Sequence, residues 1–468
     1  MSGTYSSQFQ LTFRAPFAAA ALREVDAAPP KRDGRPMSDV QQFDIVIIGG
    51  GLAGGLAALA LASRGFSGAL VDAADPAAMR GTAFDGRTSA ISYASARVFR
   101  RLGLWDAIAP DAEPIRDILV TDGRAKSHFD DGAVSNFHLH FDSRELDDTP
   151  LGWIVENRIL REVLFDAIAR EPLVSLIAPA TRAATKFDAG DAIVDLVDGR
   201  RLSAALVVAA DGRRSALRAE ANIKTNDWRY HQTGIVATVA HERPHEGVAQ
   251  EFFLPAGPFA ILPMTPVREG GHKTTSREGG QIKAYRSSLV WTERADAAPA
   301  YMALDDEKFR IEIENRFGPY LGALTPAGPR WSYPLAFTLA QSYIAPRLAL
   351  IGDAAHAIHP IAGQGYNLGI KDIAALADVL TDGRDVGLDI GALTVLQNYQ
   401  RWRRFDSAAL ALGTDLLNRL FSNDIAPLRL ARDFGMGAVN AVAPLRKFFM
   451  KQAGADMGAL PSLMAREG

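Results

Sequence analysis

A short uninterrupted apolar run, Ile45 to Ile48, gives the chain its first clear structural signal. Apolar β-branched residues without alternation are typical of a strand buried on both faces of a parallel sheet. Apolar residues then recur at helical spacing from Leu52 to Ala60, and a second apolar run, 68–71, leads into Asp72. The pattern predicts a strand, a tight turn, a helix and a second parallel strand.

The turn between the first strand and the helix is rich in glycine. Gly49, Gly51 and Gly54 occupy a G-x-G-x-x-G motif, whose glycines permit the turn, the approach of a pyrophosphate and close packing of helix on strand. The free amides of the helix would face the phosphate, and Asp72 stands where a carboxylate would bind a ribose. This context favours a dinucleotide site over a glycine-rich turn without a ligand, but it does not distinguish NAD from FAD.

Two later apolar runs each end in an acidic residue beside a glycine. The first run leads into Asp211–Gly212, and the second, 347–351, leads into Gly352–Asp353. An aspartate at the end of a buried strand can accept hydrogen bonds from the hydroxyls of a bound sugar-like chain. Arg87 follows the second strand of the chain and either reaches a pyrophosphate or faces solvent.

The stretch "PIAGQGYNLG" follows the second of these runs. Gly363 and Gly365 free the backbone for close approach to a ligand, and apolar spacing predicts a helix that begins at Asn367. The positive end of that helix would suit a ring that becomes anionic on reduction. His356 and His359 lie nearby, but no third ligand accompanies them, so we expect no metal site.

The middle of the chain alternates in the manner of strands. "GIVATVAHE", "AQEFFLP", "PFAILPM" and "SSLVWTE" predict a second sheet. Its large apolar residues either line a cavity or pack in a core, and for each of them we favour core packing by roughly two to one. These residues are Phe252, Phe253, Phe259, Ile261, Leu262, Val290 and Trp291. The polar segment 265–286 is expected to be a surface insertion. In the last 80 or so residues, apolar positions recur at helical spacing, which predicts helices with apolar and basic faces.

Composition narrows the functional classes. The chain of 468 residues is long enough for two domains, and its formal net charge of −3 gives no support for nucleic-acid binding. The absence of cysteine excludes disulfides, thiolate catalysis and zinc–thiolate sites. No apolar run is long enough to span a bilayer. Residues 1–42, rich in alanine, proline and charge, are expected to form a disordered extension.

Together these motifs resemble the FAD-dependent aromatic hydroxylases of the para-hydroxybenzoate hydroxylase fold, the group A flavoprotein monooxygenases. The resemblance runs from about Phe43 to Met457 and is closest to the ubiquinone-biosynthesis hydroxylases, through "GDAAHAIHPIAGQGYNLGIKD", "FAILPM", "RSSLVWT" and "APLRKFFMKQAG". It implies an α/β fold in which a Rossmann-like FAD-binding domain is interleaved with a mixed β-sheet substrate domain and followed by C-terminal helices. The implied segments are 43–115, 151–225 and 338–385 for FAD, 116–150 and 226–337 for the substrate sheet, and 386–468 for the helices.

The resemblance also implies roles for single residues. Asp211–Gly212 would serve FAD and the nicotinamide cofactor together, Gly352–Asp353 would touch the ribitol, and Pro360, Gly363 and Gln364 would lie near the flavin ring. Asp72 replaces the glutamate that is commoner at its position, but a carboxylate is retained. The full set of implied FAD-binding residues is Gly49, Gly51, Gly54, Asp72, Arg87, Asn157, Asp211, Gly212, Gly352, Asp353, Gly363, Gln364, Gly365, Asn367 and Leu368.

The implied activity is hydroxylation of a ring carbon of a polyprenylated phenol in ubiquinone biosynthesis. NAD(P)H would reduce FAD, and the reduced flavin would react with O2 to a flavin hydroperoxide, so no side chain is expected to carry the oxygen chemistry. The alternatives are another aromatic hydroxylase, a prenyl reductase or epoxidase, and a non-catalytic flavin-binding assembly protein. We also expect a cytoplasmic location, and the resemblance implies a quinone-biosynthesis assembly. Phe448, Phe449 and Lys451 either help the enzyme contact the inner face of the membrane or belong to a helix packed on the FAD-binding domain, and we favour the packed helix.

Overall fold

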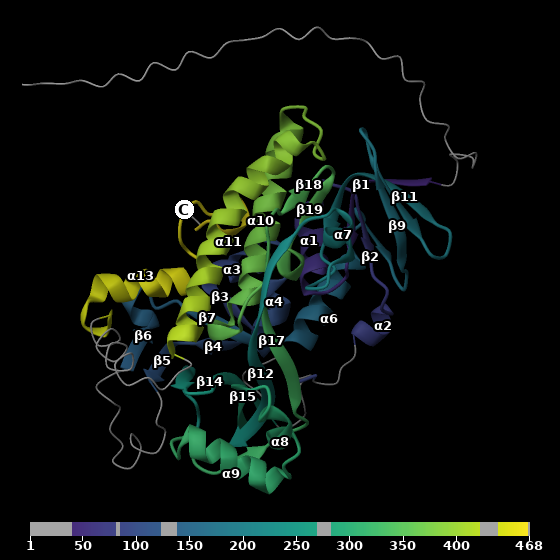
Figure 1. Ribbon diagram of the computed structural model, residues 1–468. Helices are drawn as coiled ribbons and strands as arrows, with labels where there is room; N and C mark the ends of the chain where they lie inside the picture. The colour runs from purple at the N-terminus through teal and green to yellow at the C-terminus, as the bar shows by residue number, and fades with distance from the viewer. Residues whose placement is uncertain (1–39, 81–84, 123–137, 269–281, 422–438, 467–468) are drawn as a thin grey trace, which may run out of the picture. The chain divides into compact units, whose positions relative to one another are not determined.

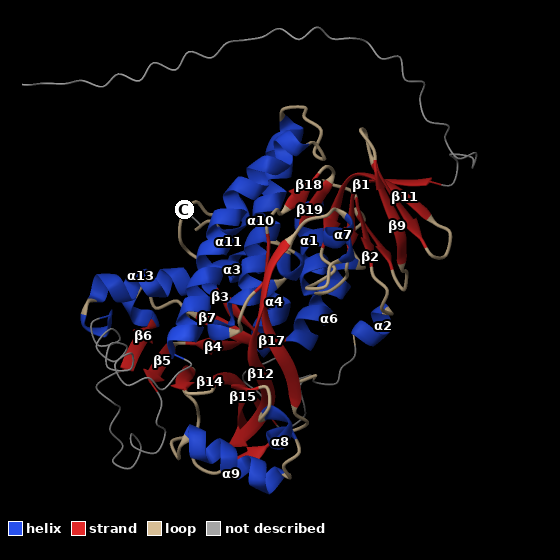
Figure 2. Ribbon diagram, viewed as in Figure 1, coloured by secondary structure: helices blue, strands red, loops and turns tan. Residues whose placement is uncertain are grey.

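The computed structural model describes residues 40–80, 85–122, 138–268, 282–421 and 439–466. The predicted N-terminal extension lies outside these residues, apart from its last three, and so does the middle of the 265–286 insertion. The described strands form three sheets of eight, nine and three strands. Figures 1 and 2 show several of the helices beside the first sheet and others beside the second.

The first sheet holds the predicted parallel strands. Its order is β18-β19-β11-β1-β2-β8, and all neighbours from β19 to β8 run parallel. Continuous apolar sequence makes the central strands, because both of their faces are covered and Ile45 and Val46 are fully buried. A hairpin of β9 and β10 extends β11. The bounds are Val40–Ile48 (β1), Gly68–Val71 (β2), Val174–Ile177 (β8), Arg182–Phe187 (β9), Ala192–Leu196 (β10), Arg201–Ala209 (β11), Ile344–Ala345 (β18) and Leu348–Leu350 (β19).

Helices cover this sheet. α1 (Leu52–Ala62) packs between α6 (Asn157–Ile168) and α10 (Gln364–Asp385), and α11 (Leu393–Phe421) runs beside α10 (Figure 1). α10 begins at Gln364, three residues before the predicted start at Asn367, because Gly363 takes the left-handed conformation that ends the preceding loop. The described residues also form α2 (Pro76–Met79), α3 (Tyr93–Arg101), α4 (Trp105–Ile108) and α7 (Ala216–Glu220). α13 (Ala443–Ala453) shares a buried cluster with Ala249 and Met264 through Met450.

The second sheet is mixed, as predicted. Its order is β20-β17-β12-β15-β14-β13-β5-β6, with β16 beside β12, and only the β13–β5 pair is parallel. α8 (Ala298–Met302) and α9 (Asp306–Phe317) follow β15 along the chain. The strands are Asp117–Asp122 (β5), His138–Asp142 (β6), Thr225–His241 (β12), Val248–Leu254 (β13), Gly257–Arg268 (β14), Ile282–Arg294 (β15), Leu324–Pro326 (β16), Trp331–Ala340 (β17) and His356–Ala357 (β20).

Alternation along the second sheet decides which of its apolar residues enter the core. Phe259 on β14 and Trp291 on β15 pack together with Phe309 of α9 in one buried cluster. The same cluster holds Phe252 and Ile261. The favoured interpretation, core packing, therefore describes these four residues of the predicted set.

A small third sheet, β3-β7-β4, is not hydrogen-bonded to either of the two predicted sheets, although β4 and β7 contact β14 of the second. It consists of Thr88–Ser92 (β3), Glu113–Ile115 (β4) and Gly152–Glu156 (β7). The predicted α/β class, with two interleaved sheets and C-terminal helices, is confirmed; the domain boundaries themselves stay predictions. Among the described residues, no helix combines the length and the apolar character needed to cross a membrane.

Candidate functional site

The glycine-rich turn after β1 is built as its motif requires. Gly49 has a φ of 107°, and a Cβ on Gly54 would stand 1.8 Å from the Gly49 carbonyl oxygen, so neither position accepts a side chain without strain. Around the Cβ position of Gly51, in contrast, no protein atom lies within 4 Å. Gly51 precedes α1. The first turn of α1 carries no acidic residue, and its N-terminus has no side-chain cap. The turn therefore leaves open space at a helix N-terminus, where an anion is favoured.

Asp72 lies against this turn. Its Oδ2 accepts a hydrogen bond from the amide of Gly50, and its Oδ1 accepts one from the amide of Ala74 at 2.7 Å. The two bonds fix the carboxylate at the end of β2 beside the open N-terminus of α1. A carboxylate oxygen can accept more than one hydrogen bond, so Asp72 keeps capacity for a ribose.

Arg87 and Asn157, far apart in the sequence, are in direct contact. The backbone amide of Asn157 donates to the Arg87 carbonyl at 2.9 Å, and the side-chain Oδ1 of Asn157 accepts from the Ser89 hydroxyl at 2.6 Å. The Arg87 guanidinium is 55% exposed, and among the described residues its ion-pair partner is Asp85, at 3.3 Å. Arg87 therefore carries an accessible charge, while the Oδ1 of Asn157 is engaged within the fold and its Nδ2 makes no hydrogen bond with the described residues.

The Asp211–Gly212 pair comes next to the first turn, since a Cβ on Gly49 would meet the Asp211 amide at 3.0 Å. Asp211 Oδ2 accepts from the amide of Ala216 at 2.9 Å and so caps the start of α7. Gly212 has a φ of 80° and open space around its Cβ position. Arg218 of α7 donates to the carbonyl of Ala354 at 2.7 Å.

The Gly352–Asp353 pair approaches α1 from the other side. A Cβ on Gly352 would lie 3.4 Å from Ala53, and the Tyr366 hydroxyl donates to the Leu52 carbonyl at 3.3 Å. Asp353 is exposed and makes no hydrogen bond or ion pair with any residue that the structure describes. Its carboxylate is therefore available to a ligand bound along the start of α1.

The loop before α10 joins the small third sheet. A Cβ on Gly363 would lie 2.8 Å from that of Ala90. Asn367 donates through Nδ2 to the Ala90 carbonyl at 2.8 Å and accepts through Oδ1 from the Ser92 amide at 2.9 Å. Its side chain thus fastens α10 to β3 and is not free for a cofactor.

The other predicted residues in and after this loop differ in which of their groups a ligand could reach. Gln364 donates to the carbonyl of Ala453 at 3.0 Å, and Leu368 is buried in the main core. Pro360 is exposed, and the Cβ position of Gly365 meets no atom within 4 Å. For Leu368, only the backbone can face a ligand.

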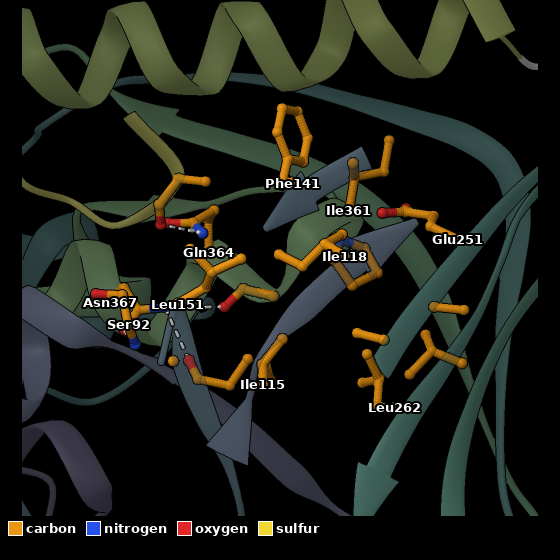
Figure 3. A pocket seen from close by; sticks show the side chains of 18 of the residues that line it. Ser92, Ile115, Ile118, Phe141, Leu151, Glu251, Leu262, Ile361, Gln364 and Asn367 are labelled. Carbon is orange, nitrogen blue, oxygen red and sulfur yellow. Dashed lines mark hydrogen bonds between the residues drawn. The ribbon is translucent and has the colours of Figure 1, made fainter. Parts of the chain in front are cut away.

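A cavity of about 200 Å³ lies between this loop and the second sheet (Figure 3). Pro360, Gly363, Gln364 and Asn367 belong to its wall. Of the large apolar residues predicted in the second sheet, Leu262 and Val290 face it. The other lining residues are mostly apolar: Thr88, Ala90, Ile91, Ser92, Ile115, Ile118, Phe141, Leu151, Gly152, Ala249, Gln250, Glu251, Pro258, Ala260, Thr292, Ile361, Met450, Ala453 and Gly454.

Glu251 is the residue of this wall that sequence reasoning missed. It is an ionisable side chain in a cavity of apolar surface, and burial raises its pKa to about 7. The available signal was a glutamate inside the apolar strand "AQEFFLP". Such a residue either faces solvent or marks a functional position, and the sequence alone does not say which face of the strand it occupies.

The arrangement fits FAD. Gly51, Gly212 and Gly365 each leave open space around the Cβ position, and Asp353, in the turn after β19, is exposed. A cavity suited to an apolar ring adjoins the loop that begins α10. His356 and His359 remain apart from any metal cluster: among the residues described, no group of three or more His, Cys, Asp or Glu side chains is placed to hold an ion.

Comparison with known proteins places these features in a family. A model of the FAD binding domain matches residues 42–384. The ubiquinone hydroxylase UbiL of Rhodospirillum rubrum is 44% identical over 92% of this chain and 94% of that protein. The 3-demethoxyubiquinol 3-hydroxylase of Escherichia coli is 33% identical over 88% and 98%. The structure of PqsL from Pseudomonas aeruginosa, with 2-aminobenzoylacetate, superposes with a TM-score of 0.67 at 23% identity, covering 85% of this chain and 99% of that one, which is a likeness of fold.

Proposed function

This chain belongs to the FAD-binding flavoprotein monooxygenases, among the ubiquinone hydroxylases, and from that premise we propose that it hydroxylates a ring carbon of a polyprenylated phenol on the path to ubiquinone. The predicted resemblance, the FAD cofactor and the monooxygenase class are confirmed by these comparisons. The substrate is inferred from the names of the relatives and from the cavity.

The observation that carries the proposal is the position of the apolar cavity. It adjoins Gly363 and Gln364 on one side and the second sheet, through Leu262 and Val290, on the other. An aromatic ring with a hydrocarbon tail suits such a wall, because apolar burial stabilises it and the few polar groups fix its orientation. A soluble charged substrate would find no complementary cation there, since the described lining residues include no lysine or arginine.

The residues that would hold the cofactor are proposals drawn from the geometry. Gly51 and the start of α1 would receive the pyrophosphate, Asp72 the ribose, and Asp353 the ribityl chain. Gly365 and the N-terminal amides of α10 would lie beside the ring. When bound and reduced by NAD(P)H, FAD supplies the oxygen-activating chemistry, and the protein supplies position, exclusion of water and proton transfer.

The test is NAD(P)H oxidation by the purified FAD-loaded protein, with and without a short-chain prenylphenol, followed by mass spectrometry of the phenol. We expect a rate stimulated by the phenol and a product heavier by one oxygen atom. Two added hydrogens on the prenyl chain would identify a reductase instead. No stimulation and no product with any phenol would remove the catalytic proposal.

Contact with the membrane is a second part of this proposal. α13 lines the cavity through Met450 and Ala453, and it exposes Phe448 and Phe449 by 47% and 42%. Lys447 of the same helix is also exposed. An exposed apolar pair beside a basic residue is typical of a helix that lies on an anionic lipid surface, and a lipid-soluble phenol would enter from that surface. A cytoplasmic location, at the inner face of the membrane, stays a prediction.

Flotation with vesicles of anionic phospholipid tests this part. The double variant Phe448→Ser with Phe449→Ser should lose vesicle binding while it retains FAD. Ile311→Ser, which removes a side chain 43% exposed on α9, is the matched control and should bind as the unchanged protein does. Equal flotation of all three proteins would contradict the role of α13. Membership of a quinone-biosynthesis assembly stays a prediction, to be tested by copurification.

A further inference from the structure

Glu251 is the one ionisable side chain among the described residues that line the cavity. It lies on β13, where it pairs with Ala260 of β14 and with Val120 of β5. In Figure 3 its carboxylate extends from the strand toward Ile361 and the interior of the cavity. The group therefore faces the space in which the substrate ring is proposed to bind.

The register of the sheet holds Glu251 in this position. Its neighbour Phe252 pairs with Phe259, and both belong to the core on the opposite face of the sheet. Ala260, the partner of Glu251, lines the cavity. Because successive residues of a strand face opposite sides, a one-residue slip of β13 that moved Glu251 out of the cavity would also move Phe252 out of the core.

No described residue satisfies this carboxyl group. Glu251 makes no hydrogen bond or ion pair within the part of the chain that the structure describes. The residue is only partly exposed and lines the cavity, and an ionisable group with a shifted pKa in a cleft is typical of a binding or catalytic site. The withdrawal from water raises its pKa to about 7. A carboxyl group of that pKa can exchange a proton near neutral pH, which an exposed glutamate does inefficiently.

The other polar groups of the wall do not offer this chemistry. Ser92 and Asn367 are bonded to each other through the Ser92 amide, and Gln364 donates to the Ala453 carbonyl. Thr88 and Thr292 carry hydroxyl groups that do not ionise near neutral pH. Proton exchange with a bound ligand thus falls to Glu251.

We propose that Glu251 is the general base that removes the proton from the hydroxyl group of the phenol substrate. This inference rests on the proposed function. In the step, the phenol O–H bond breaks and an O–H bond forms on the Glu251 carboxylate, and the electron pair stays on the phenolate oxygen. Delocalisation of that pair raises the electron density of the ring carbons, so that one of them accepts electrophilic oxygen more readily. After oxygen transfer the former phenolate oxygen is a ring carbonyl. The hydroxylated carbon then loses its hydrogen as a proton to solvent, the electron pair of that C–H bond restores the aromatic ring, and the carboxyl group returns its proton to the carbonyl oxygen.

The first test compares Glu251→Gln with the unchanged holoenzyme. Glutamine keeps the size and polarity of the side chain but cannot accept this proton. We expect hydroxylation to fall by roughly 10²- to 10⁴-fold, with FAD still bound. The rate of the unchanged enzyme should rise with pH through about 7, as the carboxylate forms, and this rise should be absent from the residual activity of Glu251→Gln.

A second readout does not depend on turnover. A phenolate absorbs at longer wavelength than its phenol, so ultraviolet difference spectra of a short-chain prenylphenol bound to the oxidised holoenzyme report its ionisation directly. The unchanged enzyme should show the phenolate band above pH 7 or so, Glu251→Asp should show it weakly, and Glu251→Gln should show the neutral phenol. Glu307→Gln, an exposed glutamate of α9, is the matched control and should reproduce the spectra and pH profile of the unchanged enzyme.

The outcomes separate this inference from the proposed function. If the unchanged enzyme hydroxylates the phenol and Glu251→Gln does so with the same rate and pH profile, Glu251 is not the base and the function stands. If the unchanged enzyme binds and ionises the phenol without hydroxylating it, the function fails and the assignment of the base survives. Should Glu251→Gln lose its flavin, the spectra of Glu251→Asp decide, and a bound phenol that is neutral at every pH in the unchanged enzyme would overturn the inference.

Discussion

The Nε2 of His356 lies 2.6 Å from the Oδ2 of Asp372, and both side chains are completely buried. Asp372 also accepts from Arg403 Nε at 2.9 Å and from the amide of Gly352 at 3.1 Å. One carboxylate therefore joins the Gly352–Asp353 motif to α10 and α11. Burial alone would raise the pKa of Asp372, but the charges and hydrogen bonds of His356 and Arg403 outweigh it and leave the pKa below its ordinary value.

Replacing Asp372 by Asn should destabilise the protein strongly. Arg403 would keep its charge in the interior with a weakened set of partners, and breaking a buried pair costs about 3–5 kcal/mol. Urea unfolding of the apo-protein measures this loss. Asp382→Asn, the same change at an exposed position of α10, should alter stability by less than about 0.5 kcal/mol. Similar stabilities of the two variants would contradict the structural role of Asp372.

The stability supplied by Asp372 should depend on pH in the acid range. Its folded pKa lies below the reference value of 3.8, so the ionised group stabilises the fold above that pH. The contribution is lost as the pH falls through the folded pKa. The measurement is the free energy of unfolding of the unchanged protein and of Asp372→Asn between pH 3 and 6, a range from roughly one unit below to two units above the reference pKa. The difference between the two proteins should become smaller toward the acid end.

His359 should give a pH dependence in a higher range. Burial lowers its pKa from 6.5 to about 4, and neither ring nitrogen has a hydrogen-bond partner among the described residues. The unfolded chain binds the proton below pH 6.5 while the folded chain does not, so stability falls as the pH is lowered from 6.5 to about 4. The full effect corresponds to about 3 kcal/mol.

The variant His359→Phe should flatten this slope, since it keeps an aromatic ring beside Tyr230 and removes the titrating group. His231→Asn serves as the control, because His231 is exposed and has a φ of 54°, which asparagine tolerates. The control should retain the slope of the unchanged protein. A slope that persists in His359→Phe would show that other groups cause it.

The two kinds of glycine in the turn after β1 should respond differently to alanine. Gly54→Ala places a methyl group 1.8 Å from the Gly49 carbonyl oxygen, and we expect failure to fold or a loss of several kcal/mol. Gly51→Ala meets no protein atom within 4 Å. It should fold normally and bind FAD more weakly, by at least about tenfold, if the open space receives the pyrophosphate. Thermal unfolding of the apo-protein and flavin titration distinguish the two effects.

Asp353→Ala should separate cofactor binding from folding. The carboxylate makes no contact with other described residues, so the apo-protein should unfold at an unchanged temperature. If Asp353 holds the ribityl chain, the loss of a charged hydrogen bond should reduce FAD affinity by roughly 1.5–3 kcal/mol. Full flavin occupancy and full activity in this variant would remove Asp353 from the cofactor site. Asp385→Ala, at the exposed end of α10, is the control.

Local sequence was sufficient wherever a structural requirement lies within a few residues. Gly49, Gly51 and Gly54 act within one turn, and the strand before them is buried on both faces because every residue from Ile45 to Ile48 is apolar. The same holds for the runs that end at Asp211–Gly212 and Gly352–Asp353. Their grouping around α1 follows from the rule that parallel strands bring their carboxyl ends to one edge of a sheet.

The tertiary structure decided which side chains remain available. Asn367 and Asp353 look alike as candidates in the sequence, yet Asn367 is bonded to Ala90 and Ser92, which are distant in the chain, and Asp353 is bonded to nothing described. Glu251 became a candidate only when the register of β13 with β14 placed it in the cavity and Phe252 in the core. Sequence determined the elements and their turns, because those depend on neighbouring residues. The free or engaged state of each polar side chain depends on partners that only folding brings within hydrogen-bond distance.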